Sequence, residues 1–254
     1  MAESELLYRV ENNIAYFTIN RETKRNSISG EVVTLFMKYL DKAEADEQVR
    51  VISITGAGDR AFCSGADLGG AAGGGGGFAG YASLLKRIAS FPKPTVARVN
   101  GYCLAGGMGF MLACDIAIAA DNSKFGTPEV NVGLWPMMIG ALIFRNALRK
   151  KAMEMVLLGE KLNAHSAVEM GLITRAVPLD KLDEEVSGVL KTLSTKSPIG
   201  MKIGKEAFYA MADMPFEEAL DYLSKKLAEV VSTADAAEGL KAFIEKRDPV
   251  FKGK

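Results

Sequence analysis

Residues 99–118 read VNGYCLAGGMGFMLACDIAI, and the rest of the chain is organised around this stretch. The β-branched run before Asn100 predicts a strand, and Asn100-Gly101 predicts a turn. Residues 105–107 are an alanine and two glycines, which let the backbone pass close to another group. Apolar residues 108–114 predict a short helix that is buried on all sides. The first amides of a helix have no partner within it and favour negative charge, so this start has the character of half an oxyanion hole.

A glycine pair before a helix is also a common tight turn, so this pair alone does not define a site. A second glycine turn upstream strengthens the functional interpretation. It reads AFCSGADL over residues 61–68 and follows a strongly β-prone run at residues 49–55. Two such turns, far apart in the sequence, are able to bring two main-chain amides to one point.

Short motifs at these turns and along the chain resemble the enoyl-CoA hydratase/isomerase (crotonase) superfamily. The resemblance rests first on FCSGADL at residues 62–68 and NGYCLAGG at residues 100–107. Further matches, in family order, are NSIS at 26–29, CDIAIA at 114–119, FGTPE at 125–129, GLI at 171–173 and FIEKR at 243–247. Together these motifs are specific for the superfamily and much less specific for the reaction.

The order of strand and helix patterns predicts an α/β class, with a sheet layered by helices. The resemblance implies a crotonase-type spiral of ββα turns over residues 1–195 and a C-terminal helical region over residues 196–254. In the family this region builds a homotrimer, often paired into a hexamer. The apolar stripes of the last helices, predicted near residues 216–231 and 234–246, are equally compatible with packing on the core of their own chain.

Residues 69–80 form a glycine-rich run that predicts a surface loop. The alternative is a mobile flap over the acyl chain, because the run directly follows the second glycine turn. A helix is expected to begin after this run, at Tyr81, and to end before the FPKP of residues 91–94.

Length and composition set broad limits. The chain has 254 residues, which suits one large domain or one domain with an appendage, and its 31 basic and 31 acidic side chains do not indicate a nucleic-acid surface. No apolar run reaches the roughly 18 residues of a membrane span, and the N-terminus lacks an apolar signal core, so a cytoplasmic protein is expected. Cys63, Cys103 and Cys114 have no paired spacing and are expected to be buried, reduced thiols. No metal motif or dinucleotide fingerprint occurs, so no metal and no cofactor are expected.

The two turns suit the chemistry of a CoA thioester. Such a thioester becomes an enolate when a proton leaves its α carbon, and each preorganised amide that holds the enolate oxygen contributes about 3–4 kcal/mol. The resemblance places these amides at Ala66 and Gly106, and the catalytic base at Glu129. The apolar neighbours of Glu129 are expected to raise its pKa towards neutrality, which suits proton transfer. The alternative is that Glu129 only caps a local turn.

Gly109 departs from the family pattern. Enoyl-CoA hydratases carry a second glutamate at this position, and their two carboxylates hold the water that adds across the double bond. One carboxylate is enough to move a proton from one carbon to another. We therefore expect isomerisation of 3-enoyl-CoA to 2-enoyl-CoA. The alternatives are hydration of 2-enoyl-CoA in fatty-acid β-oxidation or aromatic-acid degradation, and a catalytically weak acyl-CoA binder.

The resemblance also implies residues that bind the acyl-CoA substrate. They are Lys24, Arg25, Ser64, Asp67, Leu68, Gly107, Gly109, Trp135, Phe243 and Lys246. Lys24 and Arg25 lie in the loop that contacts CoA in the family, although a charged run is equally compatible with a solvated face. Phe243 and Lys246 match residues that reach the CoA of a neighbouring subunit. The bulk of Trp135 is expected to reshape the acyl site or to pack in the core.

His165 is the only histidine in the chain. A serine hydrolase on this fold would need it as the base beside a nucleophilic serine. It lies in the tetrapeptide NAHS at a predicted helix start, which indicates exposure, and no serine partner is evident. The sequence therefore does not favour hydrolysis by that route.

Overall fold

The strands form two sheets. In the computed structural model, which describes residues 3–67 and 77–254, the larger sheet contains six of the described strands and the smaller sheet four. The larger sheet contains, in spatial order, β1 (Leu6–Glu11), β2 (Ile14–Ile19), β3 (Val51–Gly56), β5 (Thr95–Val99), β7 (Ile116–Ala120) and β10 (Arg175–Val177). The smaller sheet contains β4 (Ala61–Cys63), β6 (Tyr102–Leu104), β8 (Lys124–Gly126) and β9 (Leu162–Asn163). The hairpin of β1 and β2 is antiparallel, whereas the pairs from β2 to β10 are parallel.

Consecutive strands alternate between the two sheets. β3 is followed by β4, β5 by β6 and β7 by β8, and each time the first strand joins the larger sheet and the second the smaller one. The helices that follow these pairs are α2 (Gly77–Ala89), α3 (Gly106–Leu112) and, after the short 3-10 turn η2 (Pro128–Val132), α4 (Met137–Asn146). Because parallel neighbours need a crossover connection, the chain advances as a spiral of strand–strand–helix turns. The predicted α/β class is confirmed.

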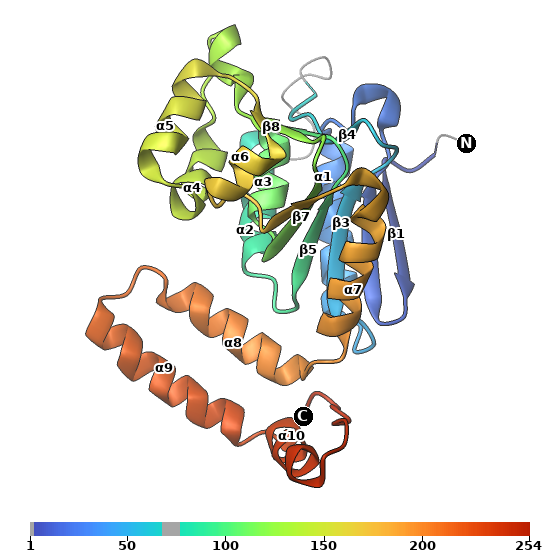
Figure 1. The fold of residues 1–254 in the computed structure, drawn as a ribbon, viewed down its shortest axis with the longest axis vertical. Helices are drawn as coiled ribbons and strands as arrows, with labels where there is room; N and C mark the ends of the chain where they lie inside the picture. The colour runs from blue at the N-terminus through green and yellow to red at the C-terminus, as the bar shows by residue number, and fades with distance from the viewer. Residues whose placement is uncertain (1–2, 68–76) are drawn as a thin grey trace.

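Helices cover both faces of the larger sheet (Figure 1). On one face, α7 (Leu182–Ser194) packs Leu182, Val186 and Leu190 against the sheet. On the other face, α1 (Gly30–Ala45) and α2 enclose the main core together with α3. The cap predicted for α1 is present, because the Ser29 side chain accepts a hydrogen bond from the N–H of Val32. This second layer contains the buried helix α3, which begins at the glycine turn that organises the sequence.

The remaining helical elements are short or lie towards the C-terminus. They are η1 (Glu22–Lys24), α5 (Arg149–Leu158), α6 (Ala164–Glu169), η3 (Leu179–Lys181), α8 (Pro198–Met211), α9 (Phe216–Val231) and α10 (Ala234–Glu245). Helices α8 to α10 extend away from the two sheets in Figure 1. Their apolar side chains are exposed within the single chain, with Leu227 at 62% and Phe243 at 83% exposure. These stripes therefore do not pack on the core of their own chain.

The glycine-rich run differs from the expectation at its C-terminal end. Residues 77–80 belong to α2, which begins at Gly77 and not at Tyr81. Adding residues to an existing helix costs little, and the apolar face of α2 is already fixed by buried Tyr81, Leu84 and Ile88. The loop and flap interpretations otherwise concern residues outside the described ones. Among the described helices, none combines the length and the apolar character that a bilayer crossing requires.

Candidate active site

The two glycine turns are in contact. Gly65 has a φ of +98°, and a Cβ at this position would lie only 2.7 Å from the Cβ of Ala105 and 3.4 Å from the nitrogen of Gly106. A Cβ at Gly107 would lie 2.2 Å from the carbonyl oxygen of Cys63. Both positions therefore need glycine, one for its backbone angle and both for close approach. The second glycine turn lies against the first turn of α3, although about forty residues separate them in sequence.

Two main-chain amides at this contact have no acceptor among the described residues. Ile28 pairs with the second glycine turn, donating to the carbonyl oxygen of Gly65 at 2.8 Å and accepting from the N–H of Asp67 at 2.9 Å. This pairing leaves the intervening Ala66 amide unused. Across residues 3–67 and 77–254, no group accepts a hydrogen bond from the N–H of Ala66 or of Gly106. Two unpaired donors beside one another are suited to bind an oxygen that carries negative charge.

The residue before Gly106 is held in a strained conformation. Ala105 has a φ of +49° and a ψ of −130°, a region that residues with a side chain rarely adopt. Its N–H donates to the carbonyl oxygen of Gly126 in β8 at 2.9 Å. This bond ties the start of α3 to the strand that leads directly into Glu129. Strain of this kind is common where a backbone group must be aimed at a ligand.

Glu129 lies in η2. Burial raises the pKa of its carboxyl above the ordinary glutamate value, and a hydrogen bond from the residue's own N–H lowers this pKa by a smaller amount. Its Oε2 atom is buried and has no hydrogen-bond partner within the described part of the chain. The local turn is closed by the main-chain carbonyl of Glu129, which accepts from the N–H of Leu134 at 2.9 Å. Main-chain atoms therefore close this turn, while the carboxyl group contacts the N–H of its own residue, and the predicted rise in its pKa is confirmed in direction.

Tyr81 is a residue of this site that sequence reasoning missed. Its hydroxyl donates to the carbonyl oxygen of Gly106, and its side chain is 9% exposed. Burial raises the pKa of the Tyr81 phenol well above its ordinary value, and the charge of Glu129 acts in the same direction. The phenol is therefore fixed against the first turn of α3, within electrostatic range of Glu129. No local pattern distinguishes Tyr81 from other apolar positions of α2.

Arg21 is the second residue that was missed. Its buried guanidinium contacts Asp67 at 2.6 Å and Glu5 at 2.9 Å, and it donates to the carbonyl oxygen of Ser27 at 2.6 Å. The hydrogen bond from Arg21 lowers the pKa of the Asp67 carboxyl, with a smaller contribution from Lys24. A lone arginine in a polar loop gives no sequence signal for such a role. The contact fixes the residue that directly follows Ala66.

The structure gathers some of the predicted binding residues and separates others. Lys24 lies 3.4 Å from Asp67, and the N–H of Ser64 donates to the carbonyl oxygen of Arg25 at 3.1 Å. These four residues form one cluster beside Ala66. Trp135 is 44% exposed, so its side chain is not fully packed in the core.

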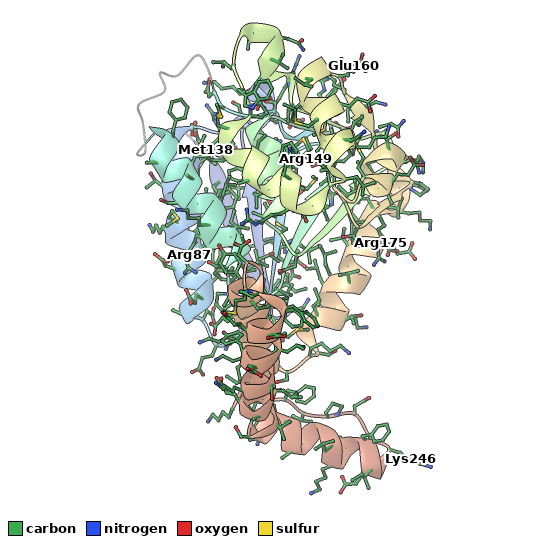
Figure 2. All side chains as sticks on the ribbon, turned by 90° about the vertical axis from the view of Figure 1, so that its left-hand side faces the viewer. Arg87, Met138, Arg149, Glu160, Arg175 and Lys246 are labelled. Carbon is green, nitrogen blue, oxygen red and sulfur yellow. The ribbon has the colours of Figure 1, made fainter. Side chains whose placement is uncertain are left out.

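The predicted binding residues of α10 lie elsewhere. Phe243 is on that helix, and Lys246 caps its end. Figure 2 shows Lys246 at the tip of the C-terminal helices, remote from Met138 on α4. Within one chain, these two residues therefore do not join the site. Leu68 lies outside the described residues, so its predicted contact with the substrate is not observed.

Other reactive side chains do not form a competing site. His165 is exposed at the start of α6, as expected, and the helix is capped by Asn163. The three cysteines are free, and burial raises the pKa of Cys63 and of Cys114 to about 12, so these thiols do not ionise near neutral pH. Among the described residues there is no group of three His, Cys, Asp or Glu side chains able to hold a metal ion.

Comparison with known proteins agrees with this arrangement. A family model described as enoyl-CoA hydratase/isomerase matches residues 9–254. The chain is 36% identical to the carnitinyl-CoA dehydratase of Escherichia coli K12, over 99% of this chain and 100% of that protein. The solved enoyl-CoA hydratase of Bacillus anthracis superposes with a TM-score of 0.93 at 28% identity, covering 98% of this chain and 100% of that chain. The enzyme of Mycobacterium smegmatis gives the same TM-score at 30% identity, covering 98% and 99%.

This chain therefore belongs to the enoyl-CoA hydratase/isomerase family. It is an acyl-CoA enzyme of the lyase/isomerase type, and the resemblance stated from its motifs is confirmed. The spiral of strand–strand–helix turns is the crotonase fold, with the expected helices at the C-terminus.

Proposed function

We propose that this enzyme isomerises 3-enoyl-CoA to 2-enoyl-CoA with Glu129 as its single acid–base group. The observation that supports this most directly is the state of that carboxyl group. It is half-buried, its pKa is raised, and its Oε2 has no partner among the described residues. Gly109, where hydratases of the family have a second glutamate, supplies no side chain. One carboxylate is able to move a proton between two carbons.

The proposed mechanism uses Ala66 and Gly106 as the oxyanion donors. The thioester oxygen accepts hydrogen bonds from both N–H groups, and the Glu129 carboxylate removes a proton from C2. The electron pair of the broken C–H bond forms the C2=C3 bond when the proton returns. In between, the charge is spread over the dienolate and concentrated on the oxygen that the two amides hold. Glu129, now a carboxylic acid whose proton exchanges with water, delivers a proton to C4, which completes the shift of the double bond.

We further propose that the cluster beside Ala66 binds the CoA part of the substrate. Lys24 and Arg25 are exposed cations on the same loop, and phosphates prefer cations and amides. Ser64 and Gly107 line the approach to the thioester, and Trp135 bounds the acyl site. The reaction needs no cofactor, because CoA is part of the substrate.

The exposed apolar faces of α9 and α10 support the proposal that the enzyme is an oligomer. An apolar face of this size on a single chain is typical of an interface. In a trimer, or a hexamer of two trimers, Phe243 and Lys246 would reach the CoA of a neighbouring subunit, which explains why they are remote from the site in their own chain.

A second candidate is the addition or removal of water. It is supported by the relative described as carnitinyl-CoA dehydratase, which is 36% identical over nearly the whole chain. With only Glu129 available, the same carboxylate would have to activate the water and protonate the α carbon. This is a larger demand on one group than isomerisation, in which the carboxylate removes one proton and then returns one.

The test is a panel of short and long 3-enoyl-CoA and 2-enoyl-CoA substrates in deuterated water, followed by mass spectrometry. We expect the wild type to shift the double bond and to incorporate deuterium, and Glu129→Gln to lose about two to four orders of magnitude in rate. If the wild type adds water to 2-enoyl-CoA and does not shift the double bond of 3-enoyl-CoA, the enzyme is a hydratase and the proposed isomerisation is wrong. Binding of acyl-CoA without exchange or turnover would indicate the weak binder.

A further inference from the structure

The hydroxyl of Tyr81 occupies the space that a side chain at Gly109 would need. A Cβ on Gly109 would lie 2.2 Å from this hydroxyl, 2.8 Å from Cγ2 of Ile139 and 3.1 Å from Cδ2 of Leu85. Atoms that are not bonded do not approach to 2.2 Å, so one of the two residues has to give way. In this chain, position 109 carries no side chain and position 81 carries the phenol.

The phenol is not free to move aside. Tyr81 is 9% exposed, and its ring packs edge-on against Phe110 with the centroids 5.7 Å apart. Its hydroxyl is anchored on the carbonyl oxygen of Gly106, in the same turn of α3 as Gly109. Displacing the ring would break this hydrogen bond and open a cavity in the core, and each of these costs free energy. A glutamate at position 109 is therefore incompatible with Tyr81 as it stands.

The phenol does not replace a carboxylate chemically. Its proton is used in the bond to Gly106, so it is not available to a substrate. Burial, with a smaller contribution from the charge of Glu129, also favours its neutral form. The space at Gly109 is thus filled by an uncharged group whose donor is already engaged, and among the described residues nearest to it there is no second base.

We propose that Tyr81 determines reaction specificity by occupying the position of a second carboxylate, so that Glu129 alone faces the substrate and water addition is disfavoured. The proposal rests on the proposed function, since it explains how the site is restricted to proton transfer. Tyr81 acts here through the space it fills, and its bond to the carbonyl oxygen of Gly106 holds the ring in place. It is a positioning residue and does not exchange protons with the substrate.

The steric part is tested without substrate, by thermal unfolding. We expect Gly109→Ala to lower Tm, and Tyr81→Phe/Gly109→Ala to recover part of that loss, because the nearest atom is removed. Gly188→Ala on α7 is the matched control, since a Cβ there would meet nothing within 4 Å. It should leave Tm unchanged or raise it. If Gly109→Ala is as well tolerated as Gly188→Ala, the steric exclusion does not exist and the proposal is wrong.

The chemical part is tested with Tyr81→Ala/Gly109→Glu in ¹⁸O-labelled water. We expect this variant to hydrate 2-enoyl-CoA at least tenfold faster than the wild type and faster than Tyr81→Ala/Gly109→Gln, which has the same shape without the charge. Equal rates for the glutamate and glutamine variants would overturn the proposal. If the glutamate variant does not fold, Tyr81→Phe tests whether Tyr81 acts by filling space. Deuterium exchange that is retained in this variant supports the space-filling role, and exchange that is abolished contradicts it.

The two parts separate this inference from the proposed function. Suppose that the wild type shows no isomerase activity but Tyr81→Phe recovers part of the Tm lost in Gly109→Ala. The proposed reaction would then be wrong, while the exclusion of a second carboxylate by Tyr81 would stand. Isomerase activity without that coupling would reject the role of Tyr81 and leave the reaction intact.

Discussion

The guanidinium of Arg21 lies 2.6 Å from the carboxylate of Asp67, the residue that follows Ala66. The same guanidinium contacts Glu5 and donates to Ser27, so one buried cation joins the N-terminal segment, the loop around Ser27 and the second glycine turn. The Arg21 side chain is 6% exposed and that of Asp67 is 15% exposed, so water screens this pair only weakly. The position of the Ala66 amide therefore depends on the ion pair between Arg21 and Asp67, which lies within the protein and does not involve the substrate.

Arg21→Met should destabilise the protein and slow the reaction. Removing the buried guanidinium leaves Glu5 without this cation and Asp67 with only the exposed Lys24, at a cost of up to about 3 kcal/mol in the free energy of unfolding. We expect kcat to fall as well, because the turn with Ala66 loses its anchor. Urea unfolding and steady-state kinetics measure both effects. The control is Arg145→Met, whose partner Asp213 is 79% exposed, and which should cost less than about 1 kcal/mol.

Local sequence patterns are sufficient to predict the elements that are defined by interactions between nearby residues. The Ser29 cap of α1, the hairpin of β1 and β2, and the helix that opens at Ser197-Pro198 follow from spacing and end signals. Strands β4 and β6 have three residues each, too few for a period to be visible. The two glycine turns are visible in the sequence and the family resemblance assigns the donor roles to Ala66 and Gly106, but only the structure shows that the turns touch.

The contacts missed by sequence reasoning are long-range. Arg21 and Asp67 are 46 positions apart, and Tyr81 and Gly106 are 25 apart. The sequence around each of these residues does not predict its partner, because a hydrogen bond between distant residues depends on the tertiary structure of the whole spiral. The same holds for the positive φ of Ala105, a residue type that does not favour this conformation.

Ala66→Val tests the oxyanion role of the second glycine turn. Ala66 is exposed, so a larger side chain should cost less than about 1 kcal/mol in stability. It would obstruct the approach of the thioester to the N–H, and losing one oxyanion donor typically lowers kcat about 10²- to 10³-fold. Stopped assays by mass spectrometry and thermal unfolding separate the two effects. Ala45→Val, at the exposed far end of α1, serves as control, and full turnover by Ala66→Val would rule out this role.

Glu129→Gln should change the pH dependence of both activity and stability. The base acts as a carboxylate, so kcat/KM of the wild type should fall as pH decreases through the Glu129 pKa, which lies above the ordinary value of 4.5. A raised carboxyl pKa means that the folded state is disfavoured once the group ionises. Relative to Glu129→Gln, the wild type should therefore lose stability as pH rises from about 4 to 8. Tm curves of the two proteins that stay parallel over this range would contradict the assignment.

Ala105→Gly should relieve the strain before Gly106. A residue held at such angles costs about 1–3 kcal/mol, and glycine removes most of this cost at an entropic penalty of about 0.5–1 kcal/mol. We expect the free energy of unfolding to increase by about 1 kcal/mol, with kcat unchanged or lower because the Gly106 amide is less rigidly aimed. Chemical denaturation and kinetics are the measurements. Ala210→Gly, exposed within α8, should cost about 1 kcal/mol instead, and a similar loss at position 105 would mean that Ala105 is not strained.

Leu227→Glu tests whether the apolar face of α9 is an interface between copies of this chain. Leu227 is 62% exposed, and Phe216 and Leu220 on the same face are 77% and 53% exposed. A charge placed in an apolar interface has to be desolvated, so we expect the oligomer to dissociate towards single chains in analytical ultracentrifugation. Acyl-CoA affinity should fall at the same time, because Phe243 and Lys246 would no longer reach a neighbouring site.

Lys225→Glu is the matched control for this experiment. It introduces the same glutamate two positions earlier, on the opposite face of α9, where the side chain is exposed. We expect it to sediment like the wild type. If both variants keep the mass of the wild type, the apolar face of α9 does not mediate assembly. If Leu227→Glu dissociates the oligomer but binds acyl-CoA as tightly as the wild type, the interface exists and the proposed contribution of Phe243 and Lys246 to a neighbouring site does not.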